Sequence, residues 1–116
     1  MRVRFKIKKY AKAVNCPKDA TKLWGKEGAC KVIQRLQELE AAECLAAMYQ
    51  IPAARFHPLE GNRKGQFAVD ARHPFRITMV PDHNPLPLKD DGGLDLTQVK
   101  AVVILKVEDY HGRKRR

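Results

Sequence analysis

The residues best suited to chemistry fall in two short stretches, HPLEGNRKG at residues 57–65 and EDYH at residues 108–111. The first stretch contains His57, and the second supplies Asp109, Tyr110 and His111. An imidazole titrates near neutral pH and can therefore accept or donate a proton, a carboxylate can accept one, and a phenol offers a surface for stacking. Together these side chains are suited to acid–base chemistry.

Cations accompany both stretches, and they suggest that the substrate is a phosphate ester. Cleavage of RNA by its own 2′-hydroxyl needs a proton acceptor, a proton donor for the leaving oxygen, and cations that stabilise the phosphorane charge. His57, His111 and Asp109 could share the proton transfers. The cations would be Arg63, Lys64 and Arg76, and arginine is favoured because its planar fork can pair with two phosphate oxygens.

Each of these residues also has a purely structural explanation. A histidine beside a proline is often a turn residue, and Asp109 could simply end a strand. Arg76 could be an exposed strand residue that pairs with Asp70 across a hairpin. The cationic turn could be a solvated surface. Composition alone leaves these alternatives open.

The overall composition narrows the class of protein. The 116 residues include 23 Lys and Arg against 13 Asp and Glu, a formal net charge of +10 that suits a polyanionic partner such as nucleic acid. The three cysteines lack C-x-x-C spacing, so neither a disulfide framework nor a zinc site is indicated, and we expect no cofactor. No apolar run is long enough for a signal peptide or a membrane span, which predicts a cytoplasmic protein without membrane association.

The first half of the chain predicts a strand followed by helices. Val3, Phe5 and Ile7 alternate with basic residues, which predicts a strand with a cationic face. The candidate contacts to RNA backbone on that face are Arg4, Lys6 and Lys8. A short helix should begin near Pro17 and end at Gly25, and apolar steps of three and four between residues 27 and 50 predict two helices or one bent helix.

The second half predicts strands. Alternating apolar residues occur at 67–70 and 75–80, a shorter strand precedes them at 55–57, and the apolar run 99–107 is typical of a central strand. Residues 81–98 have the composition of a long loop. The order predicts an α+β domain over residues 1–112: an N-terminal strand, two to three helices, then a mostly antiparallel sheet of about four further strands. A basic tail follows at 113–116.

Two motifs resemble those of a known family. The run RFHPLEGNRKGQFAVDARHPFRITMV, followed after an insertion by an apolar strand and EDYH, resembles the RelE/ParE superfamily of bacterial toxins. It is most similar to the HigB-like branch, the plasmid maintenance system killer proteins. The shared motifs are HPL-x-G-x-R-x-G and the terminal DYH.

The resemblance implies the toxin of a type II toxin–antitoxin system. It would be a metal-independent, ribosome-dependent endoribonuclease, or mRNA interferase, which cleaves translated mRNA. Its partners would be the ribosome, the mRNA and a cognate helix-turn-helix, HigA-like antitoxin. The catalytic residues that the resemblance implies are His57, Arg76, Asp109, Tyr110 and His111, with Arg63 and Lys64 as RNA-binding cations.

The sequence also departs from the family pattern, and two alternatives stay open. Glu60 stands where some relatives have a basic residue, and the 81–98 loop is longer than in minimal members. A ParE-like toxin that inhibits DNA gyrase without cleaving RNA would not need the histidines. A nucleic-acid-binding regulator is the other alternative, although no helix-turn-helix spacing is recognisable. His57 combined with Asp-Tyr-His favours the nuclease.

Overall fold

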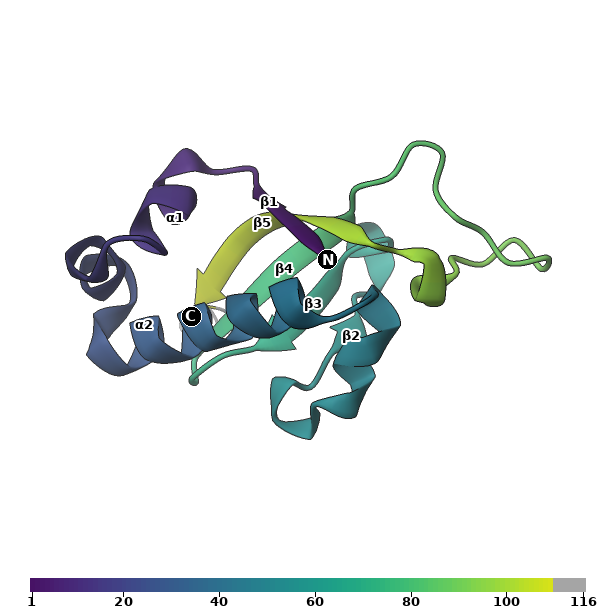
Figure 1. The fold of residues 1–116 in the computed structure, drawn as a ribbon. Helices are drawn as coiled ribbons and strands as arrows, with labels where there is room; N and C mark the ends of the chain where they lie inside the picture. Colours follow the sequence, from purple (N-terminus) through teal and green to yellow (C-terminus); the bar gives the residue numbers. More distant parts are fainter. Residues whose placement is uncertain (110–116) are drawn as a thin grey trace.

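Five strands form a single sheet, and the helices that follow the first strand pack against it (Figure 1). The computed structural model describes residues 1–109 of the chain. The strands are β1 (Arg2–Phe5), β2 (His57–Pro58), β3 (Phe67–Asp70), β4 (Phe75–Pro81) and β5 (Ala101–Asp109). The predicted α+β class, with an N-terminal strand, helices and four further strands, is confirmed.

The strand order in the sheet is β1-β5-β4-β3-β2. The pairs β2–β3, β3–β4 and β4–β5 are antiparallel, while β1 runs parallel to β5 with Val3 opposite Val102. The apolar strand β5 therefore has a neighbour on each side, as its continuous hydrophobic sequence predicts. β1 and β2 form the two edges of the sheet.

Two α-helices connect β1 to the rest of the sheet: α1 (Lys8–Ala13) and α2 (Pro17–Ala41). Pro17 occupies the first turn of α2, where its missing N–H costs nothing. At Gly25 the backbone has φ 74° and ψ 168°, a conformation essentially restricted to glycine, so α2 is two helical segments joined at a kink. The predicted helix boundary at Gly25 is correct, whereas α1 was not predicted.

The prediction that the first strand extends to Lys8 is wrong. β1 ends at Phe5, and Lys8 is the first residue of α1. Ile7 is the N-cap of this helix, with its side chain packed against the core. Lys6 still donates its backbone N–H to Ile104 O at 2.9 Å, so the chain leaves the sheet immediately after this residue. Lys6 and Lys8 therefore do not lie on a continuous strand face with Arg4.

The hydrophobic core lies between α2 and one face of the sheet. Figure 1 shows α2 running across that face. Apolar residues of α2 at helical spacing meet apolar residues that alternate along β3, β4 and β5. Trp24 is 6% exposed and packs in this core. The fully buried core residues include Val32, Leu39, Val69, Ile77, Met79, Val102 and Ile104.

A buried arginine fixes α2 to the sheet. Arg35 is 4% exposed, and its Nε donates to the backbone carbonyl of Asp70 at the end of β3, at 2.7 Å. Its Nη1 pairs with the carboxylate of Glu38 at 3.1 Å, and its Nη2 donates to the carbonyl of Ala53 at 3.2 Å. Because Ala53 belongs to the 3₁₀ helix Pro52–Ala54, one side chain connects three elements.

The segment between β4 and β5 is a long excursion from the sheet, in green on the right of Figure 1. It contains a short bridge between Leu88 and Leu94 and the 3₁₀ helix Leu96–Gln98. This confirms the loop predicted for residues 81–98, although Pro81 itself ends β4. Within residues 1–109, no helix combines the length and the apolar character needed to cross a membrane.

Candidate functional site

The sheet face opposite α2 carries two of the candidate residues, His57 and Arg76. His57 lies opposite Ala68, which lies opposite Thr78, and Arg76 lies opposite both Asp70 and Glu108. Paired residues on neighbouring strands project to the same side of a sheet, and successive residues alternate. We call this side the polar face; its polar residues are His57, Asp70, Arg76, Thr78, Lys106 and Glu108.

On the polar face, near the end of the β4–β5 pair, the carboxylate of Glu108 binds two guanidinium groups. Arg76 donates from Nε to Glu108 Oε1 at 3.1 Å. Arg63, from the 3₁₀ helix Gly61–Arg63 between β2 and β3, donates from Nη1 to the same oxygen at 3.2 Å and from Nη2 to Oε2. Gln66 accepts from Arg63 Nε at 3.3 Å. We call Arg63, Arg76 and Glu108 the arginine–glutamate cluster.

The cluster keeps Glu108 ionised although the residue is only 6% exposed. Burial alone would raise the pKa of Glu108, but the hydrogen bonds from Arg63 and Arg76 outweigh it, so that the pKa lies below its ordinary value. The hydrogen bond with Glu108 correspondingly raises the pKa of Arg63. The cluster is therefore two cations and one anion, a net positive charge on the polar face.

His57 is held in a defined tautomer. Its Nδ1 lies 2.6 Å from the backbone carbonyl of Arg55, and because a carbonyl oxygen can only accept, Nδ1 carries the proton. In the neutral ring Nε2 then has a free lone pair and can act as a proton acceptor. Arg55 itself adopts a left-handed conformation, with φ 48° and ψ 47°, which is uncommon for a residue other than glycine.

His57 and Arg76 are close enough to share a ligand. They lie two strands and two residues apart in the register, which corresponds to about 12 Å between their Cα atoms at ordinary sheet spacings. Both side chains project from the same side, so that a phosphodiester between them would be within reach of a long guanidinium and an imidazole.

The other predicted residues are distributed differently. Asp109 lies opposite Phe75 in β4, so the alternation of β5 directs it to the side of the sheet that α2 covers, away from Arg76. Lys64 is exposed next to Arg63. Tyr110 and His111 lie outside the described residues.

Arg4 is not grouped with His57. It lies on edge strand β1, while His57 lies on the opposite edge, about 19 Å across the sheet at ordinary strand spacing. Its Nε donates to Asp82 Oδ2 at 2.8 Å, and this hydrogen bond lowers the pKa of Asp82. The structural explanation offered for Arg76 is supported by the register, because Asp70 lies opposite Arg76 across the β3–β4 pair. Asp70 also pairs with Arg55 at 3.3 Å, and Arg76 forms an ion pair with Glu108.

Sequence reasoning missed Glu108. The Asp-Tyr-His motif at the end of the apolar strand points to its neighbour Asp109, and the sequence does not show which of the two acids faces Arg76. The usable signal was the alternation of β4: a carboxylate in register with Arg76 must be on the same side of the sheet. That register depends on the bulge between Thr78 and Met79, which composition does not reveal.

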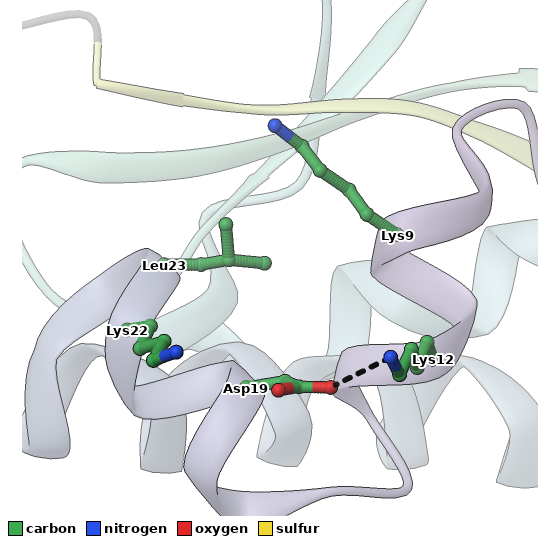
Figure 2. Close-up of a pocket in the computed structure, with 5 residues that line it drawn as sticks. All are labelled: Lys9, Lys12, Asp19, Lys22 and Leu23. Atoms are coloured by element: carbon green, nitrogen blue, oxygen red, sulfur yellow. Dashed lines mark ion pairs between the residues drawn. The ribbon is translucent and has the colours of Figure 1, made fainter.

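A second cationic region lies on the helices. The first 26 residues contain nine Lys and Arg but only one acid, Asp19. Part of this charge surrounds a hollow of about 240 Å³ between α1 and α2, shown in Figure 2. Leu23 lies between the side chains of Lys9 and Lys22 in this view, and Lys12 pairs with Asp19 at 3.8 Å. Such a surface attracts polyanions without sequence preference.

No protein-family model matches this sequence, and a search of curated proteins finds no match either. The resemblance to the RelE/ParE superfamily therefore depends on the motifs at residues 57–65 and 109–111 and on their order along the chain.

Proposed function

We propose that this protein is the toxin of a type II toxin–antitoxin system, a ribosome-dependent endoribonuclease that cleaves translated mRNA. The observation that carries the proposal is the register that sets His57 and Arg76 on one face of the sheet, with Arg63 joined to Arg76 through Glu108. The requirement for translation and the antitoxin come from the family resemblance.

The proposed reaction is an intramolecular transesterification. The Nε2 atom of His57 takes the proton of the 2′-hydroxyl, and the oxygen attacks the adjacent phosphorus. The P–O5′ bond breaks, so the products carry a 2′,3′-cyclic phosphate and a 5′-hydroxyl. Arg76 stabilises the negative charge that develops on the phosphorane oxygens. His111 would protonate the leaving 5′ oxygen, and Tyr110 would hold a neighbouring base; Asp109 would orient His111.

The charge distribution supports an RNA substrate. The cationic N-terminal region and the net positive arginine–glutamate cluster both favour binding of a phosphate backbone. An acidic antitoxin that covers these surfaces would prevent RNA from binding.

The decisive experiment combines purified protein with ribosomes that translate a defined mRNA and maps new 5′ ends by primer extension. We expect cuts within the translated region, with 5′-hydroxyl ends that require phosphorylation before ligation. His57→Ala should lower the cleavage rate about 100-fold, the usual contribution of a general base. His83→Ala is the matched control, because Nε2 of His83 accepts the backbone N–H of Lys100 in the long loop.

Three outcomes would reject the proposal. The first is intact mRNA under all translation conditions. The second is full growth inhibition by His57→Ala and His111→Ala variants in cells. The third is linearised plasmid in the presence of DNA gyrase together with uncut mRNA, which would favour the ParE-like alternative.

A further inference from the structure

The cluster contains an acid at the centre of a cationic site, which is an unexpected place for a negative charge. Among the described residues Glu108 is the one buried acid, and both of its carboxylate oxygens accept hydrogen bonds from guanidinium groups. We propose that Glu108 is a positioning residue that holds Arg63 and Arg76 together as a two-guanidinium site for the reacting phosphodiester. The inference rests on the proposed function, since it names the group that orders its phosphate-binding residues.

The two arginines come from elements that would not otherwise keep them together. Arg76 is on β4, within the sheet, whereas Arg63 is on a short turn between Gly61, with φ 65°, and Gly65, with φ 97°. A long side chain on such a turn has many rotamers, and two cations repel one another. Their nitrogens both contact Glu108 Oε1, so these two atoms are at most about 6 Å apart.

Glu108 is suited to hold charge and not to carry a proton. Two guanidinium groups hydrogen-bond to its ionised form, and the resulting low pKa makes it a weak base near neutral pH. Loss of its charge would remove the carboxylate that both guanidinium groups contact. The expected consequence is a site that still attracts RNA but no longer places the guanidinium groups accurately.

Kept RNA affinity together with slower cleavage would distinguish a positioning role of Glu108 from a merely structural one. A structural defect would weaken RNA binding and cleavage together, because less folded protein would be present. A positioning defect lowers the turnover number while affinity for RNA is kept or increases, since the competing carboxylate is removed. The comparison requires an RNA that binds without being cleaved, and RNA with 2′-O-methyl groups lacks the attacking hydroxyl.

The test uses the full chain with Glu108→Gln, and Glu43→Gln as the control. Glu43 is an exposed acid after α2, so the control removes the same charge far from the cluster. Glu108→Gln should lower kcat on translated mRNA about 10- to 100-fold and leave KM within about threefold. Its affinity for 2′-O-methyl RNA should be unchanged or higher. Glu108→Asp keeps the charge on a shorter side chain, and its kcat should lie between those of the wild type and Glu108→Gln.

An independent readout reports the geometry without RNA. In ¹⁵N NMR spectra the Nε–H resonance of Arg76 should be protected from exchange in the wild type and in Glu43→Gln, but not in Glu108→Gln. Wild-type kcat in a folded Glu108→Gln protein would overturn the inference. So would an unprotected Arg76 Nε–H in the wild type. If Glu108→Gln does not fold, wild-type kcat in Glu108→Asp would overturn it.

The failure of the proposed function gives a different result. In that case wild-type protein leaves mRNA intact in every translation reaction, while Arg76 Nε–H protection and binding of 2′-O-methyl RNA still depend on Glu108. If Glu108 orders the arginines but no RNA is cleaved, the proposed nuclease function is rejected and the inference of a two-guanidinium site is kept.

Discussion

Replacement of Arg35 should be among the most damaging substitutions in residues 1–109, although no part of the proposed reaction involves it. The side chain is 4% exposed and links α2 to the end of β3 and to the 3₁₀ helix Pro52–Ala54. Arg35→Ala removes all of these hydrogen bonds at once. It also leaves the carbonyls of Asp70 and Ala53 without this donor.

The magnitude follows from those contacts. Breaking a buried ion pair by removing one partner costs about 3 to 5 kcal/mol, and Glu38 is partly exposed, so the ion pair alone belongs at the lower end. The two carbonyls add the cost of lost hydrogen bonds, each about 1 kcal/mol. We therefore expect Arg35→Ala to lower the free energy of unfolding by about 5 kcal/mol. Arg35→Lys should lose about half as much, because an ammonium keeps the charge but lacks the planar fork.

Urea unfolding at pH 7, followed by the fluorescence of Trp24, measures the effect, with the m value as a check that the transition is unchanged. Arg72→Ala is the matched control: Arg72 pairs with Glu27 at 2.7 Å, but the two side chains are 55% and 70% exposed. Such a surface pair contributes less than about 1 kcal/mol. A loss in Arg35→Ala no larger than that in Arg72→Ala would refute the reasoning.

Further predictions concern pH, backbone conformation and surface charge. The folded pKa of Glu108 lies below its ordinary value of 4.5, so its stabilising effect is present above that pH and is lost as the pH falls through the folded pKa. The free energy of unfolding, measured in urea, should therefore fall more between pH 7 and pH 4 for the wild type than for Glu108→Gln. An equal fall in the two proteins would contradict this. Gly25→Ala should lower the free energy of unfolding by about 1 to 3 kcal/mol, because its φ of 74° and ψ of 168° exclude a side chain even though the space around it is open. An unchanged thermal unfolding midpoint in Gly25→Ala would be incompatible with that conformation. Arg4→Ala and Asp82→Ala should each leave the unfolding midpoint nearly unchanged, since this ion pair is exposed to solvent. A coupling energy between Arg4 and Asp82 in a double-mutant cycle that is well above that of ordinary surface ion pairs would contradict this.

Most of the fold could be predicted because local patterns and the final structure agree. Alternation in residues 2–5, 67–70 and 75–81 identifies strands, and the steps of three and four after Glu27 identify a helix. Gly25 marked a helix boundary because no other residue tolerates its conformation. α1 was not predicted, since its six residues are mostly basic and show little apolar periodicity.

The candidate site was only partly predictable. His57 and Arg76 were chosen for their chemistry, and the register places both on the polar face. The Asp-Tyr-His motif pointed to Asp109, whereas Glu108 is the acid in register with Arg76. A one-residue shift exchanges the two sides of a strand, and the sequence does not fix that shift.

The sequence by itself determined the α+β class, the order of the elements, the excess of positive charge and the residue types able to transfer protons and bind phosphate. Each of these follows from neighbouring residues along the chain or from composition. Only the tertiary structure decided that Glu108 joins Arg63 to Arg76, and that Arg35 connects α2 to the end of β3. The physical reason is that such contacts join residues about 30 to 45 positions apart, and their partners depend on strand register and helix packing.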